Sequence, residues 1–433
     1  MALAPPRPRL LVVTHLLLPD TCGGAAVFTD LCRALVERGY DVTVRSAYPY
    51  YPEWTDKSGR NGLRIDRYED DGMHVERFGL YIPRNPRSLW QRLVYEGSYF
   101  LSLCRSLVKD ERFDAVMVFC PLAGSVAYAG LHKLIYGRPL LLNVQDLPAD
   151  AAEAGGIASG RWAKRLLTGV QKVLLNRADA WRTISPVRAE RLEQLRGRDQ
   201  PIVLIPDWLH PSVAADIRSL PSKVGRPAAS PVRLLYSGNI GAKQGLLDFC
   251  KALQPSPAPF EFRIHGAGGA AGEVRDWVAA VGAPRFSFGP LVDESDFARS
   301  MHEADLFVIT EKPGSGASFF PSKSIPAMAA GTPILAVSSR DSPLGREMEA
   351  HGLGPWFSWP QCQEVGAMLA SLADSPGRLT TWQENALARA RFFERERCVG
   401  LFEEVLADLA CEASTRFRRA RVRPAAAPAG SAR

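Results

Sequence analysis

Two loops carry lysines in settings that suit a phosphate group. The first is GNIGAKQG at residues 238–245, in which Gly238 and Asn239 end an apolar run and Lys243 follows. Its glycines let the backbone approach a ligand and the lysine adds a point charge, so the loop is a candidate diphosphate site. The spacing of a P-loop, GxxxxGK followed by Ser or Thr, is missing. The alternative is a surface lysine beside an ordinary turn.

The second loop lies within residues 319–336, FFPSKSIPAMAAGTPILA. Ser322 is a predicted N-cap, so that free backbone N–H groups and Lys323 would both face the loop, a good seat for a phosphate. Pro326 is tolerated only in the first helical turn, which sets the start of the helix near Ser322. An ordinary loop–helix–strand unit explains the same stretch without a ligand.

Two more polar segments follow apolar runs of strand length. Gly23 and Gly24 come after the run at residues 9–18, and Gln145 and Asp146 end another such run. Ligands of α/β sheets bind at the carboxyl ends of the strands, so both segments are candidate ligand contacts. For the glycine pair, a tight turn chosen for steric reasons alone is the alternative.

A third glycine-rich segment, Gly266 to Ala271, matches the pattern GxGxxA and raises the alternative of a nicotinamide-dependent oxidoreductase. The dinucleotide fingerprint normally follows the first strand of its domain, whereas this segment follows the second. No acidic residue ends the next strand about twenty residues later, where a ribose partner is expected. The signal for a dinucleotide site is therefore weak.

The composition gives little support to metal-dependent or hydrolytic chemistry. The seven histidines show no paired metal-ligand spacing, and the sequence has no D-x-D carboxylate pair and no GxSxG elbow. The eight cysteines are scattered without a CxxC pair, which fits a reducing cytoplasm. We therefore expect no metal ion, no disulfide framework and no bound cofactor.

The net charge of +7 suits anionic partners such as nucleotides, phosphorylated lipids or a membrane surface. Residues 89–109 and 161–178 are predicted helices that mix apolar or aromatic side chains with basic ones. Such helices either lie on anionic membranes or form ordinary domain surfaces, and both readings stay open here. A basic stretch at residues 416–424 leads into Ala, Pro and Gly and is expected to be disordered.

Apolar runs of strand length alternate with helical patterns along the whole chain, which predicts an α/β fold. Residues 9–46 read strand, glycine turn, helix, strand, as at the start of a doubly wound sheet. A second series begins near residue 232, and the segment at 221–231, rich in Pro, Ala and Ser, is the best linker candidate. At 433 residues the chain is too long for one ordinary core, so we expect two domains.

Together these motifs resemble the retaining glycosyltransferases of the GT-B fold, family 4, and in particular the subgroup of colanic-acid and N-acetylfucosaminyl transferase type. The resemblance covers about residues 8–413. It rests on the order of seven motifs: GG within PDTCGGAAVF, NVQDLP, RTIS, IPDW, SGNIGAKQG, IHGAG and PSKSIPAMAAGTPILA.

The resemblance implies two Rossmann-like doubly wound domains that face each other across a cleft, the first for an acceptor and the second for a nucleotide-sugar donor. It places Lys243 and Asn239 on one side of the diphosphate, and Ser322 and Lys323 on the other. The implied nucleotide-sugar contacts are Gly23, Gly24, Gly238, Asn239, Lys243, Gly266, Leu291, Ser322 and Lys323. The implied catalytic positions are Lys243, Gln145 and Asp146.

The chain also departs from the family pattern. Two glutamates that are common in the family, eight residues apart, correspond here to Ser318 and Pro326, and Glu311 is a candidate for a partial replacement. A common histidine corresponds to Gln145, and the first basic residue of the diphosphate pair corresponds to Asn239. An inactive relative that only binds nucleotide sugars is therefore a further alternative.

The sequence thus predicts a metal-independent glycosyltransferase that acts with retention in exopolysaccharide or cell-envelope glycan synthesis. The expected donor is a UDP- or GDP-linked sugar, the expected acceptor is polyprenyl-linked or a saccharide, and no nucleic acid is expected to bind. The expected location is the cytoplasm, with the inner face of the membrane as a peripheral site. The expected parts are an acceptor domain at 1–220, a nucleotide-sugar domain at 221–392, a helix at 393–415 that returns to the first domain, and a disordered basic tail at 416–433.

Overall fold

The structure is a computed structural model that describes residues 7–20, 23–86, 88–108, 112–145, 147, 161–314, 321–372 and 374–421. The chain divides into two compact units. Unit 1 takes the residues up to Ile184, then Ala189–Ile205 and the residues from Val399 on. Unit 2 takes Ser185–Arg188 and Pro206–Cys398.

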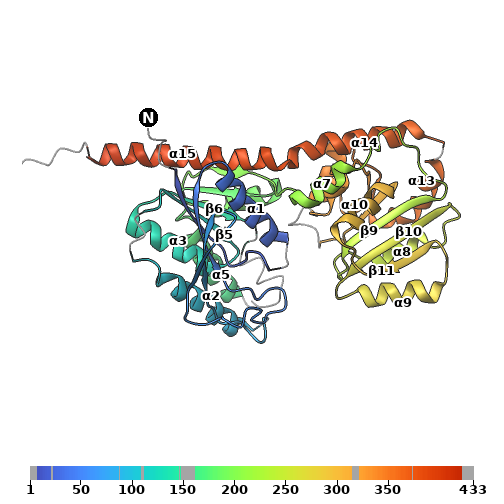
Figure 1. Ribbon diagram of the computed structural model, residues 1–433. Coiled ribbons are helices and arrows are strands. Elements are labelled where there is room, and N and C mark those ends of the chain that lie inside the picture. The colour runs from blue at the N-terminus through green and yellow to red at the C-terminus, as the bar shows by residue number, and fades with distance from the viewer. Residues whose placement is uncertain are drawn as a thin grey trace, which may run out of the picture. The chain divides into compact units, whose positions relative to one another are not determined.

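Unit 1 is built on an eight-stranded sheet in the order β3-β4-β2-β1-β5-β6-β7-β8, in which every pair is parallel except β3 with β4 (Figure 1). Its strands are β1 (Arg9–Val13), β2 (Asp41–Ala47), β3 (Asp66–Asp70), β4 (Met73–Phe78), β5 (Ala115–Cys120), β6 (Leu140–Val144), β7 (Ala180–Thr183) and β8 (Ile202–Leu204). The central strands β5 and β6 are buried at every residue, as expected for a parallel sheet that is covered on both faces.

Six helices have all or most of their residues in unit 1 among the residues that the structure describes. They are α1 (Gly23–Glu37), α2 (Leu89–Cys104), α3 (Ala123–Tyr136), α5 (Arg161–Leu175), α6 (Pro186–Leu195) and α15 (Arg395–Arg421). The last helix belongs to this unit from Val399 on, because it packs on residues that lie much earlier in the sequence. Glu403 forms an ion pair with Arg38, and the Phe402 ring lies 5.2 Å from the buried Arg182 guanidinium.

Unit 2 is built on a six-stranded sheet in the order β11-β10-β9-β12-β13-β14, and all of its pairs are parallel. The strands are β9 (Val232–Asn239), β10 (Phe260–Ala267), β11 (Phe286–Gly289), β12 (Leu306–Thr310), β13 (Ile334–Val337) and β14 (Trp356–Phe357). The order reverses between β9 and β12: the chain winds outward through β10 and β11 on one side, and through β13 and β14 on the other. This is the doubly wound arrangement that the sequence predicts.

Two hydrophobic cores cover the two faces of this sheet, because successive side chains of a strand point to opposite faces. In β12, Val308 belongs to one core while Phe307 and Ile309 belong to the other. The same alternation separates Leu335 from Ala336 in β13. The helices around the sheet are α7 (Pro211–Ser219), α8 (Leu246–Leu253), α9 (Ala271–Val281), α10 (Glu294–Glu303), α11 (Ser324–Ala329), α12 (Pro343–His351), α13 (Val365–Ser371) and α14 (Pro376–Ala390), with short 3₁₀ turns at Trp359–Glu364 and Arg391–Phe393.

The two sheets confirm the predicted α/β class, but the segment expected to be a linker has another role. Residues 221–231 lie within unit 2, and the chain passes from unit 1 to unit 2 near Ile205 instead. Lys223 is buried and donates hydrogen bonds to the carbonyl oxygens of Met301 and Ala304 and to the Thr332 hydroxyl. Although this segment is rich in Pro and Ser, its buried lysine bonds it to the rest of unit 2.

The final helix also differs from its expected bounds. α15 continues to Arg421, six residues into the segment expected to be a tail, and residues 422–433 lie outside the described part of the chain. Among the described residues, no helix combines the length and the apolar character that crossing a membrane requires.

We predict that Lys223→Met destabilises the protein by about 1–3 kcal/mol, because buried acceptors lose their donor while the side-chain volume is kept. The free energy of unfolding in urea, followed by tryptophan fluorescence, measures this loss. The control is Lys251→Met at an exposed lysine of α8, which should stay within about 0.5 kcal/mol of wild type. Equal stabilities for the two variants would show that the buried hydrogen bonds contribute nothing.

Candidate functional site

The strand order of unit 2 marks one place for a ligand, the carboxyl ends of β9 and β12. In open α/β sheets, ligands bind in the crevice outside the strand ends at the point where the order reverses. β9 ends at Asn239, and β12 ends at Thr310, next to Glu311. Most of the basic and glycine residues singled out in the sequence of this unit lie in the segments that leave this edge.

The loop that follows β9 is held by its own backbone and by its neighbours. The Ile240 N–H donates to the Ala267 carbonyl at 2.8 Å, and the Gly241 N–H donates to the Gln244 side chain at 2.9 Å. The Lys243 carbonyl accepts from the Lys312 N–H at 2.8 Å, which joins this loop to the segment after β12. The segments that follow β9 and β12 are therefore connected at the switch point, the place where the strand order reverses. The Lys243 side chain is exposed at this edge.

Two glycines are required for this geometry. Gly238 has a φ of +128°, and a Cβ on it would lie 3.9 Å from the Lys323 ammonium nitrogen. Gly268 has a φ of +138°, and a Cβ there would lie 2.5 Å from both the Asn239 side-chain oxygen and the Ile240 carbonyl. The GxGxxA segment thus serves close backbone packing beside Asn239, which is reason enough for glycine at this position without a dinucleotide.

Lys323 is brought to the same place from the other side of the switch point. Its Nζ donates to the Tyr236 hydroxyl at 3.0 Å and lies 4.1 Å from the centre of the ring. The Tyr236 hydroxyl in turn donates to the Asn239 carbonyl at 2.6 Å. Burial lowers the pKa of Lys323 to about 8, and the nearby Glu311 carboxylate opposes this shift. A lysine that is poorly hydrated beside glycine backbone suits an anionic ligand.

The structure brings together four of the predicted residues of unit 2. Gly238 pairs with Gly266 across β9 and β10, Asn239 follows Gly238, and the Lys323 ammonium lies beside Gly238. Leu291 is half exposed just after β11, two strands away from β9.

Ser322 was predicted to be the N-cap of the helix, and this is wrong. α11 begins at Ser324, its N-cap is Lys323, and no side chain caps it. The exposed Ser322 lies in the preceding turn, where its carbonyl accepts from the Ile325 N–H. The Lys323 side chain does not cap the helix and donates to the Tyr236 hydroxyl instead.

In unit 1, the predicted residues lie at the carboxyl edge of that sheet. Gly23 and Gly24 open α1, and a Cβ on Gly24 would lie 3.4 Å from the Phe28 ring. Gln145 follows β6 directly, and Asp146 lies outside the described residues.

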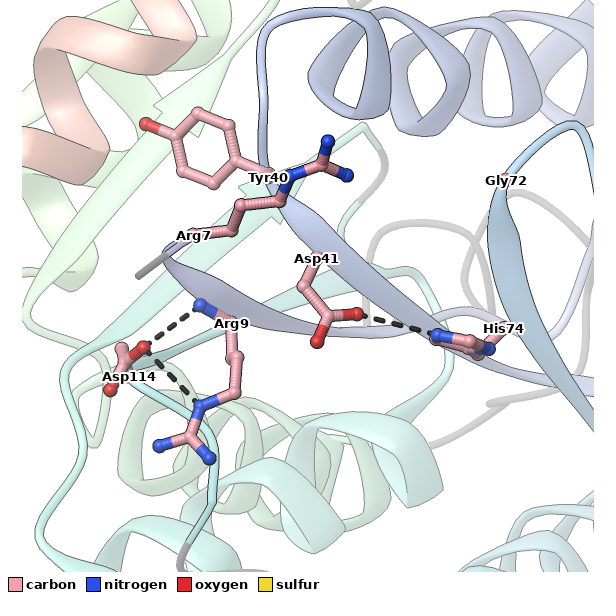
Figure 2. A pocket seen from close by; sticks show the side chains of 7 residues that line it. All are labelled: Arg7, Arg9, Tyr40, Asp41, Gly72, His74 and Asp114. Carbon is pink, nitrogen blue, oxygen red and sulfur yellow. Dashed lines mark hydrogen bonds and ion pairs between the residues drawn. The ribbon is translucent and has the colours of Figure 1, made fainter. Parts of the chain in front are cut away.

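A cavity of about 630 Å³ opens at the opposite edge of the same sheet (Figure 2). Two of its carboxylates have partners: Asp114 accepts from the Arg9 backbone N–H at 2.8 Å and lies 3.7 Å from Arg9 Nε, and His74 Nε2 lies 3.5 Å from the Asp41 carboxylate. The lining residues are Arg7, Arg9, Tyr40, Asp41, Gly72, His74 and Asp114. None of the predicted site residues lines this cavity, and its place at the amino ends of β1 and β2 is not where α/β sheets bind their ligands.

Two residues of the unit 2 edge escaped the predicted set. Tyr236 lies inside the apolar run of β9, where its alternation with Leu235 indicates only a core residue. Glu311 was considered only as a partial replacement for a family glutamate, and its position directly after β12 was the available signal. Among the described residues, no three His, Cys, Asp or Glu side chains gather as a metal site would need.

The comparisons with known proteins agree with the resemblance seen in the sequence. The model of the glycosyl transferase 4-like domain matches residues 23–208. Over this segment the chain is similar to the family 4 glycosyltransferases. The chain is 26% identical, over 342 residues, to the putative colanic acid biosynthesis glycosyl transferase WcaI of Escherichia coli K12. That match covers 76% of this chain and 83% of WcaI.

Comparison with solved structures shows that the chain has the GT-B fold. Sucrose-phosphate synthase from Thermosynechococcus elongatus is similar with a TM-score of 0.68 and 16% identity, covering 94% of this chain and all of that one. Anabaena HepE in complex with UDP has a TM-score of 0.66 at 16% identity, covering 93% of this chain and all of HepE. WaaG, a glycosyltransferase involved in lipopolysaccharide biosynthesis, has a TM-score of 0.59 at 13% identity, over 92% of this chain and 99% of WaaG.

We predict that Gly268→Ala costs about 1–3 kcal/mol of stability, because it combines an unfavourable φ with a backbone contact at 2.5 Å. It should also increase amide hydrogen exchange in residues 238–245. Gly269→Ala is the matched control, since a Cβ at that position meets nothing within 4 Å. Equal melting temperatures for the two variants would contradict the role given to Gly268.

Proposed function

We propose that the chain transfers a sugar from a UDP- or GDP-linked donor, with retention, to a polyprenyl-linked or saccharide acceptor in exopolysaccharide or cell-envelope glycan synthesis. The observation that carries this proposal is the Lys323 ammonium, held beside the bare backbone of Gly238 at the switch point of unit 2. The similarity to WcaI supports the polysaccharide context. The similarity to HepE, whose structures contain UDP and UDP-glucose, supports the class of donor.

The chemistry follows from the bond that breaks. The sugar leaves a nucleoside diphosphate, on which negative charge develops in the transition state. Fixed positive groups stabilise this charge without reorganisation, and removing one such group typically costs a factor of about 10²–10³ in rate. We assign this role to Lys243 and Lys323, which lie on the two connected sides of the switch point. Because two lysines supply the charge, the proposed reaction needs no metal ion and no other cofactor.

The remaining predicted residues have supporting roles in this proposal. The backbone at Gly238, Asn239 and Gly266 lets the diphosphate approach, and Ser322 lies next to Lys323. The segment at Leu291 contacts the base. In unit 1, we assign Gly23 and Gly24 to the nucleotide-sugar donor, and Gln145 and Asp146 to the transfer step.

We predict that Lys243→Ala lowers the rate of nucleoside diphosphate release, in the presence of donor and acceptor, by at least about 100-fold. The Lys251→Ala variant removes an exposed lysine of α8 and should keep wild-type turnover. A near-normal rate for Lys243→Ala would remove this residue from the site.

Binding of nucleotides separates this function from its alternatives. UDP or GDP at 100 times its dissociation constant should raise the free energy of unfolding by about 2.7 kcal/mol. NAD should leave it unchanged, whereas an oxidoreductase would show the opposite pattern. A relative that binds nucleotide sugars without transferring them would show the stabilisation but no acceptor-dependent release of nucleoside diphosphate.

We also propose that unit 1 contacts the inner face of the cytoplasmic membrane. α2, α3 and α5 carry large apolar side chains that are exposed to solvent, and α5 also carries several basic residues. An apolar surface with nearby cations is the combination that binds anionic lipid. The most exposed of these side chains are Trp90 (73%), Leu101 (65%), Leu134 (65%) and Val173 (59%).

We predict that the protein sediments with vesicles of phosphatidylglycerol and phosphatidylcholine but not with pure phosphatidylcholine. The double variant Trp90→Ser with Leu101→Ser should lower the bound fraction several-fold, because it removes two exposed apolar groups from α2. Leu63→Ser is the control, since Leu63 is 84% exposed but lies outside these helices. Equal sedimentation of all three proteins would argue against this surface.

A further inference from the structure

Glu311 stands at the switch point with its backbone fixed on both sides. Its N–H donates to the Val337 carbonyl at 2.9 Å, and its carbonyl accepts from the Trp359 indole N–H at 2.6 Å. The first bond ties Glu311 to the neighbouring strand, and the second closes it against the 3₁₀ turn. The side chain therefore starts from a rigid point directly after β12.

The carboxyl group of Glu311 is only partly satisfied. The Ser342 hydroxyl donates to it, while the oxygen of that hydroxyl accepts from the Gly345 N–H at 3.1 Å. The other carboxyl oxygen, Oε2, is buried and has no hydrogen-bond partner among the described residues. Leaving a buried acceptor without a donor is unfavourable, so a ligand group that donates to Oε2 would be stabilised here.

Lys323, the positive group that acts on Glu311, does not donate to this oxygen. Burial raises the pKa of Glu311 to about 7, and the Lys323 ammonium opposes this shift. Lys323 itself donates to the Tyr236 hydroxyl at 3.0 Å. No ion pair within 4.0 Å joins Lys323 to Glu311 in the described part of the chain. Each of the two groups is held by its own contacts, Glu311 by Val337 and Lys323 by Tyr236.

Two hydroxyl groups next to these charges are unsatisfied as well. Thr310 Oγ1 directly precedes Glu311, Ser324 Oγ directly follows Lys323, and both are buried without a partner among the described residues. Together with Glu311 Oε2, three unpartnered polar atoms thus belong to the two short segments that flank the switch point. Buried polar atoms are rarely left unpaired, and several in adjacent segments indicate a polar ligand.

We propose that Glu311 binds the donor by accepting a hydrogen bond from one of its sugar hydroxyls, while Lys323 contacts the neighbouring phosphate. This inference rests on the proposed function and names a recognition residue within the same site. A carboxylate only accepts, and a sugar hydroxyl donates readily, so the two groups match. Lys323 only donates, which matches a phosphate oxygen. The hydroxyl belongs either to the ribose or to the transferred sugar, and the choice of probe distinguishes them.

The test measures the binding of four probes, UDP, UDP-glucose, GDP and GDP-mannose, to the full-length protein by calorimetry. Glu311→Ala should weaken the probe that wild type binds best by at least tenfold, and Glu311→Gln should lie between Glu311→Ala and wild type. If the nucleoside diphosphate is weakened too, the hydroxyl is that of the ribose. If only the nucleotide sugar is weakened, the hydroxyl is on the transferred sugar. Glu273→Gln, at an exposed glutamate of α9, should bind as wild type.

Thermal unfolding without ligand separates recognition from a structural role. Because Glu311 is unsatisfied in the free chain, Glu311→Gln should keep or raise the melting temperature while it weakens binding. A lower melting temperature with wild-type affinity would overturn the inference. So would unchanged affinity of Glu311→Ala for every probe that wild type binds. If wild type binds none of the four probes, the proposed function itself fails, and that result is distinct from a failure of Glu311 alone.

Discussion

The carboxyl edge of unit 2 depends on one lysine that is held against the face of a tyrosine. Tyr236 uses its ring to contact the Lys323 ammonium and its hydroxyl to hold the Asn239 carbonyl. A cation over an aromatic ring is stabilised even where water is scarce, and this keeps a charge close to glycine backbone. One buried side chain of β9 therefore sets the positions of two segments that are more than eighty residues apart in the chain.

Much of this arrangement could be predicted from the sequence, because it follows from continuous apolar runs and from glycine. The runs that became β5, β6 and β12 are buried at every residue, and this gives parallel strands a plain signal. The segment at Gly238 was singled out because its glycines and Lys243 follow an apolar run, and the structure gives Gly238 a positive φ. The sequence did not predict contacts that long side chains make with residues far away in the chain. The helix begins at Ser324 and not just after Ser322, and the Lys323 side chain contacts Tyr236, which lies 87 residues earlier; no local pattern encodes that contact.

The family match and the candidate donor site lie in different parts of the chain. The glycosyl transferase 4-like match ends at residue 208, before the first strand of unit 2. The residues proposed to hold the donor all follow that point except for the glycine pair of α1. Their assignment rests on the switch point of the second sheet and on the GT-B fold that the chain shares with solved glycosyltransferases. The glutamates common in the family are absent at Ser318 and Pro326, so the proposed recognition of the donor relies on other side chains.

The course of α15 has a consequence for the synthesis of the protein. The partners of Arg38 and Arg182 are Glu403 and Phe402, which the ribosome adds about two hundred residues after the last strand of unit 1. At translation rates of about 5–20 residues per second, that interval is roughly 10–40 s. During this time the nascent amino-terminal unit exposes a surface that its own helix will later cover. Unit 2 thus has the opportunity to fold first, although it begins second.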